Sequence, residues 1–116
     1  MRLIIATLLL AHGVAHIVGF RGAWAPTRTT VIGNRIDLGA SWMRLVGLLW
    51  LVGAIAFGIT AIAALGNAAW WQSAALGLTG ASLTLCLLQL PETKFGVVLN
   101  LALVGVLVGG SRLGWF

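Results

Sequence analysis

The sequence predicts an all-α fold, a membrane-embedded up-down bundle of four helices. The first observation is composition: 60% of the 116 residues are hydrophobic and 8% are charged, whereas a soluble domain carries about 25% charged residues. So few charges cannot cover the surface of a water-soluble globule, and lipid is therefore the expected solvent. The second observation is spacing, because the apolar residues form four stretches long enough for a hydrocarbon core about 30 Å thick.

Each apolar stretch predicts a helix rather than a barrel strand. Backbone groups cannot remain unpaired in lipid, so a spanning segment is either helical or part of a closed barrel. Barrel strands alternate polar and apolar residues over about ten positions, and these stretches are apolar throughout. The first looks like a signal peptide, but its length favours a retained helix. The predicted helices cover residues 3–20, 42–65, 70–90 and 95–110.

The connections indicate a single domain over residues 1–116. Residues 21–41 form the one long polar loop, which Pro26 interrupts, and Ser41 is expected to cap the helix that follows. The links GNA and PETK are short, and Pro91 ends the third helix. Short links keep successive helices adjacent and antiparallel, which gives the up-down arrangement.

Basic residues predict the orientation in the membrane. Most lie on the side reached after the first helix, and positive charge marks the cytoplasmic side. We therefore expect a multi-pass protein of the bacterial inner membrane with both termini outside the cytoplasm. The net charge of +5 is then explained by topology, and no nucleic acid partner is expected. The cytoplasmic group is Arg21, Arg28, Arg35, Arg44 and Lys94, and the opposite group is Arg2 and Arg112.

Small residues recur four positions apart, which is the spacing of helix contacts. Such pairs let helices approach closely in a membrane, so we expect glycine-lined contacts in the bundle, with some of these faces left for a neighbouring subunit. The single cysteine, Cys86, is expected to be a packed residue. The glycines in these pairs are Gly19, Gly58, Gly77, Gly105 and Gly109.

Two histidines interrupt the first apolar stretch, in LLLAHGVAHIVGF. His12 and His16 are four residues apart, so both rings project from one face of a helix. A polar ring in hydrocarbon costs free energy unless it finds a partner. Histidines in membrane segments therefore face the bundle interior, a water-filled cavity or a cofactor.

Three interpretations of this pair stay open. In the first, two neutral rings are hydrogen-bonded inside the bundle. In the second, one ring is an axial ligand of a tetrapyrrole, either haem or a chlorophyll-type pigment. In the third, the pair handles protons or a substrate in a pore. No metal site is expected, because the chain has no further histidine to complete one. The partners available to the first interpretation are backbone carbonyls and Thr7, Thr60, Thr79, Ser82, Thr84 and Asn100.

Carboxylates are scarce in this chain. Asp37 and Glu92 are the only two, both in predicted connections, so neither paired-carboxylate catalysis nor a buried acid for proton-coupled export is available. We therefore expect no enzyme and no catalytic residue. Glu92 and Lys94 form a predicted loop site, where Glu92 suits the positive end of the fourth helix dipole. Asn100, further along that helix, is the predicted intramembrane partner of His16.

Two stretches resemble the paired signatures of a group of small uncharacterised bacterial four-helix membrane proteins. HGVAHIVGF matches the first signature, HGxxHxxGF, and ETKFGVVLN matches the second, an acidic residue followed by xKFGxxxN. The acidic position is glutamate here, where aspartate is expected. The resemblance implies the four-helix layout and groups the two stretches as one site, without bringing an established activity. The matched residues are His12, Gly13, His16, Gly19, Phe20, Glu92, Lys94, Phe95, Gly96 and Asn100.

The function that these observations favour is that of a small non-enzymatic membrane subunit, packed in a homo-oligomer or accessory to a larger membrane complex. Its partners would be lipids, further copies of itself or larger membrane proteins. The alternative is a small homo-oligomeric transporter or channel with His12, His16 and Asn100 along its path. A third possibility is a haem- or pigment-binding redox or photosynthetic subunit.

Overall fold

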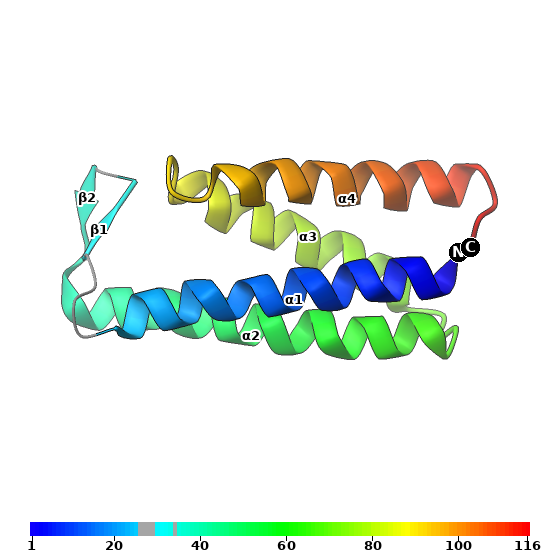
Figure 1. Cartoon of the computed structure of the whole chain (residues 1–116), viewed down its shortest axis with the longest axis horizontal. Helices are drawn as coiled ribbons and strands as arrows, with labels where there is room; N and C mark the ends of the chain where they lie inside the picture. The colour runs from blue at the N-terminus through cyan, green and yellow to red at the C-terminus, as the bar shows by residue number, and fades with distance from the viewer. Residues whose placement is uncertain (26–29, 34) are drawn as a thin grey trace.

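The computed structural model describes residues 1–25, 30–33 and 35–116, and within these residues it has four long helices and one short hairpin (Figure 1). The helices agree with the prediction to within four residues at every end. They are α1 (Arg2–Trp24), α2 (Gly39–Leu65), α3 (Trp71–Leu88) and α4 (Lys94–Arg112), and the antiparallel hairpin strands are β1 (Val31–Ile32) and β2 (Ile36–Asp37).

The predicted polar loop 21–41 is wrong at both ends, because α1 continues through Trp24 and α2 begins at Gly39. The Trp24 indole Nε1 donates to the Arg44 carbonyl at 3.1 Å, which ties the last turn of α1 to the first turns of α2. The Arg44 guanidinium also lies over the Trp24 ring, 5.5 Å from its centroid. These contacts extend both helices beyond their apolar stretches.

Ser41 lies inside α2 and does not cap it, contrary to the prediction. The hairpin brings the Asp37 carboxylate to the helix start, where Oδ1 accepts the Gly39 backbone N–H at 3.0 Å. Gly39 has φ +75° and Gly33, in the hairpin turn, has φ +59°, a region that favours glycine because it has no Cβ. The predicted loop features Pro26 and Arg28 lie outside the described residues.

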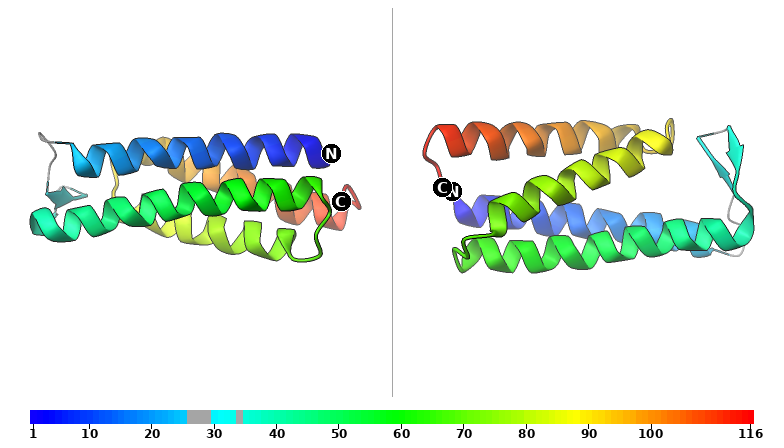
Figure 2. Two further views of the ribbon diagram at one scale, coloured as in Figure 1. Left: turned by 90° about the horizontal axis from the view of Figure 1, so that it is seen from below. Right: turned by 180° about the vertical axis from the view of Figure 1, so that it is seen from behind.

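The helices pack as two hairpins that cross. α1 lies along α2, α3 packs against both α2 and α4, and both chain ends lie together at one end of the bundle (Figures 1 and 2). Within the described chain, α1 and α4 are not a packed pair, and their ribbons separate toward the hairpin end. The molecule is elongated, with extents of 45 × 21 × 17 Å.

The apolar core fills the half of the bundle that holds both chain ends, called the terminal half below. Ile5, Leu9 and Phe57 are fully buried there, and Trp71 packs edge-on against Phe116 with ring centroids 5.1 Å apart. The remaining buried core residues are Ala6, Ala61, Ala64, Ala75, Leu103 and Leu107.

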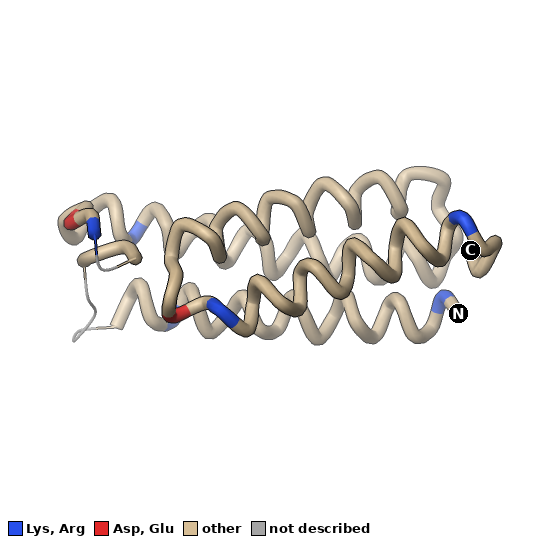
Figure 3. The backbone as a smooth tube through the Cα atoms, turned by 90° about the horizontal axis from the view of Figure 1, so that it is seen from above, with Lys and Arg blue, Asp and Glu red and all other residues tan. Residues whose placement is uncertain are grey.

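The outer faces of the helices are apolar. Large hydrophobic side chains such as Val14, Ile62 and Val98 are more than 60% exposed, and charged residues lie toward the two ends (Figure 3). All four helices are long and apolar enough to cross a membrane. The opposite half, which holds the β1–β2 hairpin and is called the hairpin half below, contains the candidate site.

Candidate functional site

Both histidines point into the bundle from α1. His12 is 8% exposed and His16 is 2% exposed, and their ring centroids are 5.0 Å apart. Phe57 of α2 packs against both rings, with centroids at 4.8 and 5.1 Å. Trp50, two turns earlier on α2, meets the His16 ring edge-on at 4.8 Å. These four rings form one aromatic cluster between α1 and α2.

Hydrogen bonds fix the orientation of the two imidazoles. His16 Nδ1 donates to the His12 carbonyl at 2.9 Å, so in the neutral ring Nε2 keeps its lone pair. His12 Nε2 lies 3.2 Å from Ser82 Oγ on α3. Ser82 is therefore the side-chain partner among those predicted, and the predicted threonines instead donate to carbonyls of their own helices. These are Thr7, Thr60, Thr79 and Thr84.

Glycines make room for the aromatic cluster. A Cβ at Gly53 would lie 2.7 Å from His16 Cδ2, and one at Gly19 would lie 2.5 Å from the Trp50 ring. At Gly13 a Cβ would come within 3.0 Å of the Ala54 carbonyl oxygen. Each of these glycines lets α1 and α2 approach with large rings between them.

Of the five glycines predicted at helix contacts, Gly19 alone meets a neighbouring helix in this chain. A Cβ added at any of the other four would find no described atom within 4 Å. Their role in packing within the bundle is therefore not observed, and contact with another subunit stays a prediction. These four are Gly58, Gly77, Gly105 and Gly109.

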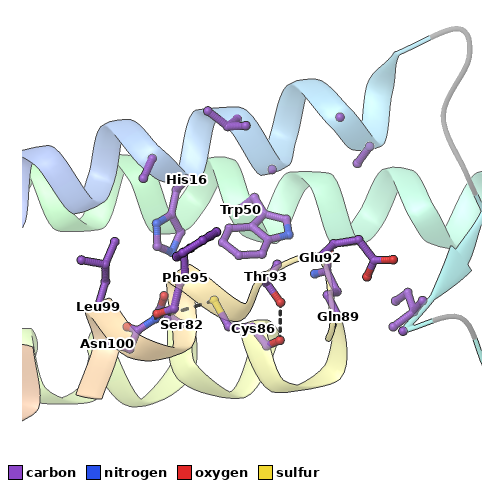
Figure 4. Close-up of a pocket in the computed structure, with 18 of the residues that line it drawn as sticks. His16, Trp50, Ser82, Cys86, Gln89, Glu92, Thr93, Phe95, Leu99 and Asn100 are labelled. Atoms are coloured by element: carbon purple, nitrogen blue, oxygen red, sulfur yellow. Dashed lines mark hydrogen bonds between the residues drawn. The ribbon is translucent and has the colours of Figure 1, made fainter. Parts of the chain in front are cut away.

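A cavity of about 520 Å³ lies in the hairpin half between α1 and the α3–α4 pair (Figure 4). Its volume falls in the range of small-molecule sites, and its lining is mostly apolar. His12, His16, Asn100 and Glu92 line it, so the two predicted stretches do meet at one place. Lys94 is not among the lining residues, and its Nζ lies 5.4 Å from the Phe95 ring centroid.

Asn100 is fully buried, but it has a different partner from the one predicted. Its Nδ2 donates to the Gly96 carbonyl at 2.8 Å and lies 3.7 Å from Cys86 Sγ. Among the described residues no hydrogen bond joins Asn100 to His16, because α1 and α4 are not a packed pair here. The Asn100 side chain is, however, within hydrogen-bonding reach of the His12 imidazole on α1. Cys86 also accepts from Thr93 through its carbonyl, which closes the α3–α4 turn.

Three buried polar atoms have no hydrogen-bond partner among the described residues, and all three residues line the cavity. They are Trp50 Nε1, Gln89 Nε2 and Asn100 Oδ1. A buried polar group left unpaired costs about 1–3 kcal/mol, so their gathering at one place is informative. Neither Trp50 nor Gln89 is among the site residues predicted from the sequence, although the depth of Trp50 in its apolar segment signals an N–H that needs a partner.

The hairpin covers one end of the cavity. Val31, Ile32 and Gly33 line it, and a Cβ at Gly33 would lie 2.9 Å from the Leu88 carbonyl oxygen of α3. At the base of the hairpin the Thr30 side chain, together with the Gly39 N–H, holds the pKa of Asp37 below its ordinary value by hydrogen bonding.

The histidine pair does not fit a tetrapyrrole well. The two rings lie side by side on one helix face, so they cannot serve as opposed axial ligands of one iron. His12 Nε2 is engaged by Ser82, which leaves His16 as the single available ligand. The described residues around the cavity include no Lys or Arg to pair with haem propionates, and no three metal-binding side chains among the described residues are placed to hold one ion.

Comparison of the chain with protein-family models, with curated proteins and with solved structures gives no match.

Proposed function

We propose that this chain is a multi-pass membrane protein that binds a small, mostly apolar molecule in the cavity of its hairpin half. The membrane part of the proposal is supported by four helices of spanning length and hydropathy. It is also supported by the large hydrophobic side chains on their outer faces, since soluble monomers rarely expose such extended apolar surface.

The proposed location is the bacterial inner membrane, with the hairpin half toward the cytoplasm and both termini outside. The described basic residues favour this orientation: Arg21, Arg35, Arg44 and Lys94 belong to the hairpin end, against Arg2 and Arg112 at the other. Fusion of a reporter to either terminus, active only in the periplasm or only in the cytoplasm, tests this orientation.

Ligand binding is supported by one observation above all: three residues that line one cavity each carry a buried polar atom with no hydrogen-bond partner among the described residues. A polar group without a partner destabilises a fold, and three such groups around one space are accounted for if a ligand supplies their hydrogen bonds. Small-molecule sites are mostly apolar with a few convergent polar groups, and the cavity has this composition.

The same geometry favours binding over conduction. The cavity ends at the core of the terminal half, where Leu9, Phe57 and Leu107 are at most 2% exposed. A path through one copy would have to open that core. Packing with further copies or with a larger membrane complex remains part of the proposal, since the open glycine faces leave room for a neighbouring helix.

The test is to identify what the purified protein retains, using two glycine variants as a matched pair. Gly22 and Gly58 both lie in helices where an added Cβ meets no described atom within 4 Å, but Gly22 lines the cavity and Gly58 does not. After purification in mild detergent, mass spectrometry of the organic extract should find one enriched molecule in the wild type and in Gly58→Phe, and much less in Gly22→Phe. Identical extracts from all three proteins would contradict the proposal.

A further inference from the structure

We infer that the molecule in this cavity is an uncharged amphiphile whose head both accepts and donates hydrogen bonds, with its chain leaving between α1 and α4. This inference rests on the proposed function and names the ligand class. It follows from three properties of the cavity: the charges around it, the polar atoms left unpaired and the wall that is open.

The charges around the cavity disfavour an ionised head. The one carboxylate among its described lining residues is Glu92, and no described lining residue is Lys or Arg. An anionic head would therefore face a like charge and no cation. Asn100 lies six residues into α4 from Lys94, or about 9 Å along the helix axis at ~1.5 Å per residue. A cationic head could pair with Glu92 at the end of the cavity, but at the depth of Asn100 an unpaired charge of either sign is costly.

The unpaired atoms specify a head with two kinds of oxygen. Among the described residues Trp50 Nε1 and Gln89 Nε2 are donors without an acceptor, and the indole nitrogen faces the side where Gln89 and Glu92 lie (Figure 4). Asn100 Oδ1 is an acceptor with no donor in hydrogen-bond geometry within the same residues. A carbonyl or ether oxygen satisfies the first two and a hydroxyl satisfies the third. A pure hydrocarbon would leave all three unpaired.

The wall between α1 and α4 is the open one. Val18 of α1 is 72% exposed, and Phe95 and Leu99 of α4 are 74% and 54% exposed, yet all three line the cavity. Residues that line a cavity and also face outward mark its opening. In the proposed orientation this opening faces the acyl chains, so an apolar chain attached to the head passes directly into lipid.

The experiment uses four probes with the same twelve-carbon chain and different heads: 1-monododecanoylglycerol, methyl dodecanoate, dodecyl phosphate and dodecyltrimethylammonium. The readout is the indole N–H resonance of Trp50 in 15N-labelled protein in detergent micelles, identified by its loss in Trp50→Phe. A hydrogen bond to a ligand oxygen should move this resonance downfield. Saturable shifts are expected for the two neutral probes and not for the two charged ones.

Two variants separate the roles of the polar atoms. Asn100→Leu should weaken 1-monododecanoylglycerol about fivefold, the value of one hydrogen bond of about 1 kcal/mol. It should leave methyl dodecanoate unchanged, because that probe has no hydroxyl to donate. Gln89→Leu should weaken both, since both have a carbonyl. If Asn100→Leu does not fold, Gln89→Leu and the comparison of the four probes still test the inference.

The opening is tested by a second matched pair. Val18→Phe should slow or weaken binding of both neutral probes, whereas Val14→Phe, one turn away, equally outward and not lining the cavity, should not. The inference is overturned if a charged probe binds as tightly as the neutral probes or more tightly. It is also overturned if Asn100→Leu weakens the binding of both neutral probes by the same factor. In either case the proposed function stands. Absence of any saturable shift, together with identical organic extracts, overturns both.

Discussion

The two halves of this bundle are built from the same four helices and solve the packing problem differently. In the terminal half, alanine, leucine and phenylalanine side chains close onto one another, and Ile5, Leu9 and Phe57 are fully buried. In the hairpin half, imidazole, indole and amide groups meet around a space of about 520 Å³. The difference shows how one bundle separates the part that holds it together from the part that holds a ligand.

Physical chemistry gives the two halves opposite roles in stability. In lipid, the association of helices depends on close packing and on hydrogen bonds, because the surrounding chains are as apolar as the side chains. The terminal half supplies close packing, whereas the hairpin half contains three buried polar atoms that have no partner in the part of the chain that the structure describes. We therefore expect truncations to be costly in the first half and mild in the second.

The largest effect is expected for Leu9→Ala in the terminal half. Leu→Ala in a protein core costs about 2–5 kcal/mol, and the low end applies here because transfer to lipid contributes little. The free energy of unfolding, measured by titration with a denaturing detergent, should fall by about 2–3 kcal/mol. Leu10→Ala, at a neighbouring position that is 46% exposed, should change it by less than about 0.5 kcal/mol. Equal losses would mean that the terminal half is not the source of stability.

Alanine substitutions at two glycines of α2 are expected to change the free energy of unfolding in opposite directions. A methyl group at Gly53 would lie 2.7 Å from His16 Cδ2, so Gly53→Ala forces the ring to move and should cost about 1–3 kcal/mol. Gly58→Ala meets open space and should stabilise the helix by up to about 1 kcal/mol. Thermal unfolding of both variants in the same detergent checks this. A stabilised Gly53→Ala would show that the aromatic cluster is loosely packed.

Substitution of one tryptophan in each half compares the contributions of the two halves to stability. Trp71→Phe removes atoms packed against Phe116 in the terminal half and should cost about 1–2 kcal/mol. Trp50→Phe also removes atoms, but it removes a buried N–H without a partner as well, and these effects offset each other. The ligand-free Trp50→Phe protein should therefore stay within about 1 kcal/mol of the wild type in the same unfolding assay. A loss as large as that of Trp71→Phe would argue that the Trp50 N–H is satisfied within the chain.

How far the sequence predicts this molecule depends on whether a feature is local. Long apolar runs set the four helices. The cost of leaving an imidazole unpaired in apolar surroundings predicts that His12 and His16 face inward. The partners of Asn100 depend on which helices are neighbours, and short links alone do not decide between a packed α1–α4 pair and an open one. Gln89 is the residue that follows α3, and its place at the cavity depends on the α3–α4 turn, which residue type alone does not specify.

The start of α2 likewise depends on residues that are not adjacent in the sequence. Ser41 has the residue type of a helix cap, but Asp37 takes the position next to the first free N–H of α2. The choice depends on the turn around Gly33 and on the positive φ of Gly39, which a propensity argument for single residues does not capture.

The smallest effect is expected from pH at this same contact. Hydrogen bonds from Thr30 and Gly39 lower the pKa of Asp37 from its ordinary value of 3.8, so the stabilisation is present above that value and is lost as pH falls through the lower pKa of the folded state. The backbone amide resonance of Gly39 should stay constant from neutral pH to about 4.5 and move upfield below it. Asp37→Asn can still accept the N–H but has no proton to gain, so its Gly39 resonance should stay constant over the whole range. A midpoint at or above 3.8 in the wild type would show that these hydrogen bonds do not hold the Asp37 carboxylate.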